Sequence, residues 1–275
     1  MTATLPDQPM HWDNGVPPAH APTPPADPWI ALRRHTPARI SLGRAGTSLP
    51  THEVLRFAAA HALARDAVHL PLDVVPLLAA LGASNGREPV QVTSRAGSRV
   101  EYLTRPDLGR QLAPASRELL QADGAVGLCI VIGDGLSAIA AQRHALPLVA
   151  ELAGAGVTAD RLVVATQARV ALGDEIGERL GASLVLMLLG ERPGLSSPDS
   201  LGAYLTWAPR PGRADSERNC VSNIRPEGLA LPQAAARIAW LVHESRRRRV
   251  TGIGLKDDSE VPALDAGGPP AVPAT

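Results

Sequence analysis

The chain has 275 residues with 27 basic and 27 acidic side chains, so no global positive field exists to recruit nucleic acid or anionic lipid. Its two cysteines, Cys129 and Cys220, do not suggest a disulfide framework or a clustered zinc site, and they favour a reduced, cytoplasmic compartment. The N-terminus lacks a signal-peptide pattern, and no apolar run approaches the roughly 18 residues that a membrane-spanning helix needs.

The first third of the chain is expected to be helical after a disordered start. Met1–Pro28 holds eight prolines and few large apolar residues, which predicts a disordered arm. Thr51 is a suitable cap for a helix over His52–Ala67, and the apolar Leu72–Leu81 predicts a second helix. Residues 29–120 should therefore form a smaller, mainly helical region. Its exceptions are two short strands or extended segments, Val90–Val92 and Val100–Leu103.

From Gly127 onward, strands alternate with helices. Leu128–Ile132 is a continuous apolar run, which is typical of a strand buried in a parallel sheet. The other expected strands are Leu162–Ala165 and Ser183–Leu189, and the expected helices run from Ser137 to about Ala153, over Asp174–Leu180 and over Pro232–Arg248. This alternation predicts an α/β fold with a Rossmann-like parallel sheet in residues 121–257. Residues 258–275 are expected to be a disordered tail.

A long connection, Gly190–Gly228, follows the third of these strands. It is rich in Gly, Pro, Ser, Asn and Arg, and a connection of this length inside a compact domain is usually functional or disordered. Tyr204, Trp207 and Ile224 favour burial and therefore an ordered structure. We expect a loop that faces a ligand or a partner at the carboxyl end of a strand, where open α/β sheets bind ligands.

The residues alone leave two functions open. Gly133-Asp134-Gly135 is placed like a dinucleotide-binding turn, but the third glycine of that motif is missing. A stand-alone, nucleotide-binding Rossmann-like protein is therefore one possibility, weakly supported. A non-catalytic module that docks a partner through the long loop is the other.

Three segments resemble a single enzyme family. They are GERPGLSSPDSLGAYLTWAPRPGR followed by RNCVSNIRPEG, then RISLGRAG followed by LRFAAAHALARDAV, and YLTRPDLGRQL. All three are similar to the small (light) subunit of ethanolamine ammonia-lyase, and the similarity extends over roughly Trp29–Asp257.

The resemblance implies a subunit of an adenosylcobalamin-dependent lyase that converts ethanolamine to acetaldehyde and ammonia. In that family a large subunit, a TIM barrel, holds the substrate, and the small subunit closes the cobalamin site at the shared interface. No residue of this chain would then be catalytic or would bind a metal. Some relatives enter a bacterial microcompartment through an N-terminal helix, but the prolines of Met1–Pro28 do not permit such a helix here.

The resemblance also assigns three cofactor-binding residues. Val170 stands in ARVALGDEIG, Glu191 is the acid of GERPG, and Cys220 is the cysteine of RNCVSN. The sequence has no D-x-H-x-x-G motif, which supplies a histidine to cobalt in many cobalamin proteins. The cofactor is therefore expected to keep its own dimethylbenzimidazole as the lower ligand, with no cobalt ligand from this chain.

Overall fold

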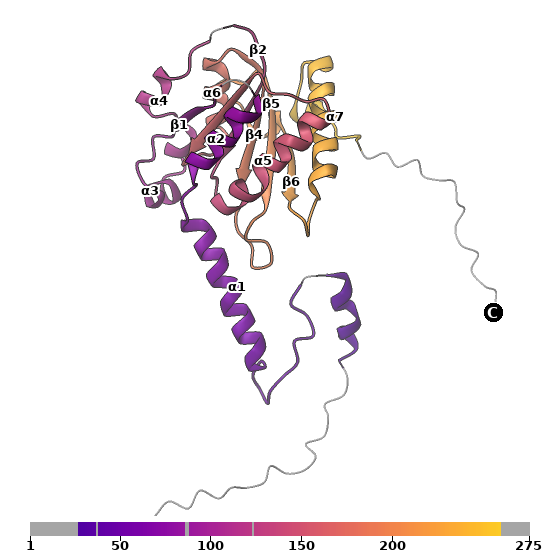
Figure 1. Ribbon diagram of the computed structural model, residues 1–275. Helices are drawn as coiled ribbons and strands as arrows, with labels where there is room; N and C mark the ends of the chain where they lie inside the picture. The colour runs from indigo at the N-terminus through magenta and orange to yellow at the C-terminus, as the bar shows by residue number, and fades with distance from the viewer. Residues whose placement is uncertain (1–26, 37, 86–87, 123, 260–275) are drawn as a thin grey trace, which may run out of the picture. The chain divides into compact units, whose positions relative to one another are not determined.

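The computed structural model describes residues 27–36, 38–85, 88–122 and 124–259 (Figure 1). Two compact units divide the chain, Met1–Val54 and Leu55–Thr275. Nearly all of the predicted arm and tail lies outside the described residues, so their disorder stays a prediction. The domain boundaries expected after residues 120 and 257 also stay predictions.

The first unit contains the 3-10 helix η1, Pro28–His35. Asp27 begins this helix because its carboxylate accepts a hydrogen bond from the Trp29 N–H at 3.0 Å. Pro28 suits the first helical position, where a backbone N–H has no partner inside the helix. Within the described residues, the first helix therefore begins beside the expected Trp29.

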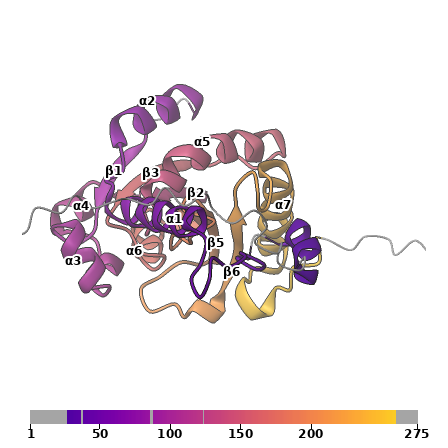
Figure 2. The ribbon, with the colours of Figure 1, turned by 90° about the horizontal axis from the view of Figure 1, so that it is seen from below.

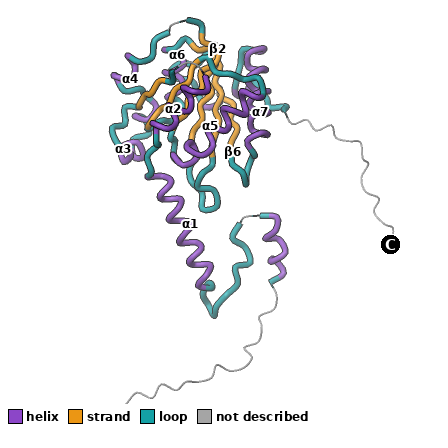
Figure 3. The backbone as a smooth tube through the Cα atoms, in the orientation of Figure 1, coloured by secondary structure: helices purple, strands orange, loops and turns teal. Residues whose placement is uncertain are grey.

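A six-stranded sheet forms the centre of the second unit (Figure 3). The strands are β1 (Val90–Thr93), β2 (Val126–Gly133), β3 (Arg161–Thr166), β4 (Ala182–Gly190), β5 (Leu201–Trp207) and β6 (Arg218–Ile224). Their order is β1-β3-β2-β4-β5-β6. The first four in this order are parallel, whereas β5 and β6 are antiparallel to their neighbours. The predicted α/β class and a mostly parallel sheet are thereby confirmed.

Helices cover both faces of this sheet (Figure 2). On one face, α2 (Val74–Asn85), α5 (Ala138–Gly154) and α7 (Leu231–Arg248) pack against side chains that include Leu128, Ile130 and Leu186. On the other face, α6 (Leu172–Arg179) packs against side chains that include Cys129 and Val131. Because successive residues of β2 point to opposite faces and both faces are covered, the strand reads as an unbroken apolar run.

The remaining helices are shorter or lie outside these layers. They are α1 (Thr51–His69), α3 (Arg99–Thr104), α4 (Pro114–Glu118) and the 3-10 turns η2 (Leu108–Arg110), η3 (Asp215–Glu217) and η4 (Gly252–Gly254). None of the described helices is by itself both long and apolar enough to span a membrane. The helix Thr51–His69 and the segment Val74–Ala83, bent by 69° against each other, reach that length and composition only as a pair.

The extended segment expected over Val100–Leu103 is instead helix α3. Ser98 caps this helix, since its hydroxyl accepts a hydrogen bond from the Glu101 N–H at 3.2 Å. Ser followed three residues later by Glu is a helix-start pattern, and here it outweighs the strand preference of Val100 and Tyr102. Val90–Val92, by contrast, lies in strand β1 as predicted.

The prediction of one long loop over Gly190–Gly228 is wrong in its middle, because β5 and β6 lie there. Alternate residues of β5 are buried in the layer beneath α5 and α7, including Leu201 and Leu205. The edge strand β6 has only three buried positions. Because its sequence RNCVSNI is mostly polar, no alternation of apolar and polar residues is visible in it. An edge strand needs only one apolar face, so its composition resembles that of a loop.

Two glycines allow the chain to pass close to itself at the carboxyl end of β4. The Leu136 N–H donates to the Gly190 carbonyl at 2.8 Å, which joins the turn after β2 to the last residue of β4. A Cβ on Gly190 would lie 1.9 Å from the Ser137 carbonyl oxygen. Gly135 has φ of +54°, and a Cβ there would lie 2.2 Å from the Gly190 carbonyl oxygen.

Gly190→Ala should therefore destabilise the fold by more than about 3 kcal/mol, because backbone rather than a flexible side chain fills the space. Gly154→Ala is the matched control. Gly154 ends α5 and has open space where its Cβ would stand, so alanine should be neutral or should add about 0.5–1 kcal/mol. Urea unfolding of the purified chains measures both changes. Equal free energies of unfolding for the two variants would contradict the close approach at Gly190.

Candidate functional site

A cavity of about 390 Å³ opens at the carboxyl ends of the central parallel strands. The chain passes from β2 to β3 on one side and then crosses back over β2 to β4 on the other. Such a reversal leaves a crevice outside the strand ends, which is the usual ligand site of an open α/β sheet. The lining comes from the turns after β2, β3 and β4 together with two tyrosines: Gly135, Leu136, Ala168, Arg169, Val170, Leu189, Gly190, Glu191, Arg192, Tyr102 and Tyr204.

The structure brings the three predicted site residues together around Tyr204. Val170 and Glu191 line the cavity beside Tyr204. Cys220 is not part of the lining, but it is the cross-strand partner of Tyr204, and the Tyr204 hydroxyl is hydrogen-bonded to its sulfur. These residues come from the β3–α6 turn, the end of β4, and strands β5 and β6, so only the folded chain places them side by side.

The side chain of Glu191 is hydrogen-bonded to other residues of the chain. One carboxylate oxygen accepts a hydrogen bond from the Ser200 hydroxyl at 2.5 Å, and both oxygens lie 3.3 Å from the Asn223 N–H. The Glu191 N–H in turn donates to the Ser200 carbonyl at 2.9 Å. Glu191 therefore fastens the 191–200 loop and the end of β6 while it lines the cavity.

Tyr204 and Cys220 are protonated at neutral pH. The pKa of Tyr204 is raised, first by burial and then by electrostatic interaction with the neighbouring Cys220 and Glu191. The pKa of Cys220 is also raised, first by desolvation and then by the carboxylate of Glu191, against a lowering by the Tyr204 hydrogen bond. A protonated thiol is a poor nucleophile, so this pair provides a binding surface rather than a reactive centre.

Asp134 holds the opposite wall of the cavity in place. Its buried carboxylate accepts hydrogen bonds from the backbone N–H groups of Gln167 and Ala168, each at 2.9 Å, and pairs with Arg99 at 3.1 Å. Burial raises the pKa of Asp134, whereas these hydrogen bonds and the charge of Arg99 oppose that rise. Gln167 adopts a left-handed φ of +55°, which turns the chain sharply after β3 and presents Val170 to the cavity.

Two arginines enclose the ring of Tyr102. The guanidinium of Arg99 lies 4.7 Å from the ring centroid and that of Arg169 lies 4.4 Å from it, which is the range of favourable cation–π contacts. The Tyr102 hydroxyl donates to the Ala168 carbonyl at 2.9 Å. Helix α3 is thereby attached to the same turn that Asp134 fixes.

Three buried polar atoms at this wall have no hydrogen-bond partner among the described residues. They are Nη2 of Arg99, Nε of Arg169 and Oε1 of Gln167. Of these three residues only Arg169 lines the cavity. An unpaired buried polar group is costly, so this side of the cavity is held by contacts that are incompletely satisfied within the described residues.

The sequence does not predict most of this wall. It places Asp134 in a turn and does not assign Arg99, Tyr102 or Arg169 to the site. Tyr102 and Arg169 did carry a signal, because both lie in or beside segments that resemble the family. Their convergence depends on α3 meeting the β3–α6 turn, and no local sequence pattern reports such a contact.

Among the described residues that line the cavity there is no histidine, lysine or cysteine, and the one carboxylate, Glu191, is hydrogen-bonded to Ser200. Nor does the described part of the chain arrange three or more His, Cys, Asp or Glu side chains to hold a metal ion. The fold and the site together define an α/β protein with a candidate ligand-binding cavity at the carboxyl ends of its parallel strands.

Comparison with known proteins gives the family of this chain. The family model of the ethanolamine ammonia-lyase light chain (EutC) matches residues 26–256. A protein of Ralstonia nicotianae described as ethanolamine ammonia-lyase small subunit is 53% identical over 250 residues, covering 88% of this chain and 92% of that protein. Proteins with the same description from Bradyrhizobium diazoefficiens and Pseudomonas syringae are 55% and 48% identical over 245 and 271 residues. They cover 86% and 94% of this chain, and 94% and 91% of their own lengths. The chain belongs to the ethanolamine ammonia-lyase light chain family, whose members are subunits of a lyase.

Asp134→Asn should destabilise the chain by about 3 kcal/mol or more, because asparagine turns an amide group toward one of the two N–H donors and leaves Arg99 without its carboxylate. Asp107→Asn removes an exposed carboxylate that pairs with Arg105, and it should leave stability near the unmodified value. Urea unfolding compares the two variants. A loss no larger for Asp134→Asn than for Asp107→Asn would show that the carboxylate does not fix this wall.

Proposed function

We propose that this chain is the small subunit of an adenosylcobalamin-dependent ethanolamine ammonia-lyase, in which it closes the cobalamin site at the interface with a large subunit. The reaction is the conversion of ethanolamine to acetaldehyde and ammonia. One observation supports this proposal above the others. Val170, Glu191 and Cys220 come from separate elements, and the fold gathers them around one cavity at the carboxyl edge of the sheet.

The chemistry of the cavity fits the rim of a corrin. A corrin is apolar over its faces and carries amide side chains around its edge, so it needs apolar walls and a few hydrogen-bonding groups. Val170, Leu136 and Leu189 supply apolar surface. Glu191 supplies a hydrogen-bond acceptor, and Arg169 and Arg192 supply donors.

The size of the cavity supports a shared site. Pockets that hold a whole drug-sized molecule have volumes of about 300–1,000 Å³, and cobalamin is larger than such molecules. The 390 Å³ cavity therefore accommodates only one part of the cofactor, and a second chain must cover the rest.

In this arrangement the chain binds and orients the cofactor but does not itself take part in the reaction. When bound, adenosylcobalamin would supply the radical chemistry of the reaction. Glu191 would accept hydrogen bonds from amides of the cofactor, Val170 would exclude water, and the protonated pair of Tyr204 and Cys220 would give an uncharged surface beside it. The proposed cofactor keeps its own dimethylbenzimidazole as the lower ligand, with no cobalt ligand from this chain.

Helix α1 supports the need for a partner. Leu55, Phe57 and Leu63 are 63%, 48% and 58% exposed. Leu55 and Phe57 lie on nearly opposite sides of the helix, since each residue advances it by about 100°. Large apolar side chains exposed on two sides of one helix are typical of a surface that a partner covers. We propose that the large subunit, a TIM barrel, covers α1, and that the parallel strands of this chain form a Rossmann-like unit beneath the cofactor.

The structure gives little support to a nucleotide site at the same edge. A phosphate would require free backbone N–H groups in the turns after the strands. The carboxylate of Asp134 occupies the N–H groups of Gln167 and Ala168, and its negative charge would repel an anion. The remaining alternative, a docking module without a cofactor, differs from the proposal in predicting no cobalamin dependence.

Co-expression with a barrel-type large subunit from the same source tests the function. The purified complex should release acetaldehyde from ethanolamine only when adenosylcobalamin is present. Each chain alone should be inactive and should bind cobalamin weakly, because half of a divided pocket recovers little of the cost of immobilising the ligand. Tight binding by this chain alone in equilibrium dialysis would contradict a shared site, and a complex inactive with cobalamin would contradict the activity.

The variant Glu191→Gln tests whether Glu191 contacts the cofactor or only holds the 191–200 loop in place. Replacing one acceptor oxygen by a donor should weaken adenosylcobalamin binding to the complex by about ten- to a hundredfold, because a hydrogen bond to a charged acceptor contributes about 1.5–3 kcal/mol. Ser200→Ala is the control, since it removes the hydroxyl bonded to Glu191 but keeps the carboxylate. It should lower the melting temperature of the complex and leave the affinity nearly unchanged. An unchanged affinity for Glu191→Gln would remove Glu191 from the cofactor site.

A further inference from the structure

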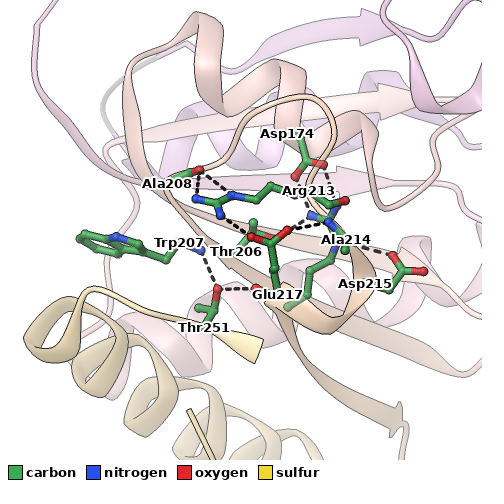
Figure 4. Close-up of polar contacts among 10 residues, drawn as sticks. Asp174, Thr206, Trp207, Ala208, Arg213, Ala214, Asp215, Glu217 and Thr251 are labelled. Atoms are coloured by element: carbon green, nitrogen blue, oxygen red, sulfur yellow. Dashed lines mark hydrogen bonds and ion pairs between the residues drawn. The ribbon is translucent and has the colours of Figure 1, made fainter. Parts of the chain in front are cut away.

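A buried ion pair lies on the same face of the sheet as Tyr204. It is closer than Tyr204 to the amino ends of the parallel strands. The side chains of Asp174 and Arg218 are 2% and 3% exposed. Both carboxylate oxygens of Asp174 are engaged, since Nη1 of Arg218 donates to Oδ1 at 2.5 Å and Nη2 to Oδ2 at 2.6 Å. The contacts around Asp174 and Thr206 are drawn in Figure 4.

The guanidinium of Arg218 also holds two neighbouring segments. Its Nη1 donates to the Thr206 hydroxyl at 3.0 Å, and its Nη2 donates to the Arg213 carbonyl at 2.9 Å. One side chain thus joins helix α6, strand β5, strand β6 and the connection between the two strands. Such a fork of donors fixes both distance and orientation, which a single point charge does not.

Both strands held by the pair carry a residue of the proposed cofactor site, and Val170 lies just before α6. Tyr204 precedes Thr206 by two residues on β5, and Cys220 follows Arg218 by two residues on β6. Residues two apart on a strand point to the same face, so the ion pair and the site lie on one side of the sheet. On the helical side, Val170 precedes Asp174 by four residues, about one turn.

Stability alone does not account for a charged pair at this position. Burial raises the pKa of Asp174, and the hydrogen bonds and charge of Arg218 oppose that rise. Replacing a buried ion pair by apolar side chains of similar volume is often neutral or stabilising, whereas removing one partner is strongly destabilising. What the ion pair supplies, and apolar contacts do not, is a fixed geometry between the elements.

We infer that Asp174 and Arg218 are positioning residues for the cofactor site: their bidentate pair sets the spacing between the wall that carries Val170 and the wall that carries Tyr204 and Cys220. This inference rests on the proposed function, because it concerns the same cavity. Neither residue touches the ligand. They act by holding three elements at the separation that the ligand requires.

The test uses the complex with the large subunit and measures two quantities for each variant, the melting temperature and the dissociation constant of adenosylcobalamin by equilibrium dialysis in the dark. Arg218→Met leaves Asp174 buried without a partner, so its melting temperature should fall sharply. The double variant Asp174→Leu with Arg218→Met should recover at least half of that loss. Its affinity for the cofactor should nevertheless remain at least tenfold below that of the unmodified complex.

Two further variants show whether affinity simply follows stability. Thr251→Val removes the hydrogen bonds from the Trp207 N–H and to the Glu217 carbonyl, which secure the same β5–β6 connection at a distance from the cavity. It should lower the melting temperature with little change in affinity. Arg218→Lys keeps the charge but not the fork, and it should bind the cofactor more weakly than Thr251→Val even if the two melt alike. If the double variant does not fold, this comparison decides the matter.

Two results would overturn the inference. One is a folded double variant that binds adenosylcobalamin as tightly as the unmodified complex. The other is an affinity that falls in proportion to melting temperature across all variants, Thr251→Val included. Failure of the unmodified complex to bind adenosylcobalamin would be a different outcome, because it would overturn the proposed function itself.

Discussion

The carboxylate of Asp134 joins three segments that are distant in the sequence: the end of β2, the turn after β3, and helix α3. A buried carboxylate is costly unless it is paired and hydrogen-bonded, and Asp134 meets that need with two backbone N–H groups and Arg99. The partners it requires determine the course of the chain around it. The left-handed turn at Gln167 and the placement of Val170 both follow from this one group.

The two faces of the sheet are built differently, and the site belongs to only one of them. Helix α5 has 17 residues and covers its face with apolar side chains. Helix α6 has only 8 residues, and polar groups lie around its first turn. Val170 lines the cavity just before the helix begins, and Asp174 pairs with Arg218 from within the first turn. The cavity and the ion pair therefore lie near the same end of α6.

The proposed division of roles, in which the chain binds a cofactor and the cofactor reacts, follows from the same geometry. Acid–base catalysis requires groups that are free to exchange protons near the operating pH. Here Asp134 is occupied by backbone N–H groups, Glu191 by Ser200, and the tyrosine and thiol beside the cavity have raised pKa values. What remains is a shaped surface with unpaired polar atoms, which suits binding and orientation rather than reaction.

Local signals in the sequence are enough to predict several elements. The apolar run Leu128–Ile132 predicts β2, Ser137 predicts the start of α5, and three motifs predict the family. The strands β5 and β6 escape such a prediction because they lie in a stretch rich in Gly, Pro and polar residues, and β6 itself is mostly polar. The meeting of Val170, Glu191 and Cys220 around Tyr204 depends on the tertiary structure, as do the contacts by which Asp134 and the pair of Asp174 and Arg218 join separate elements. Helix caps and buried strands are specified by a few adjacent residues. A buried carboxylate, by contrast, meets its partners only after the chain has folded around it.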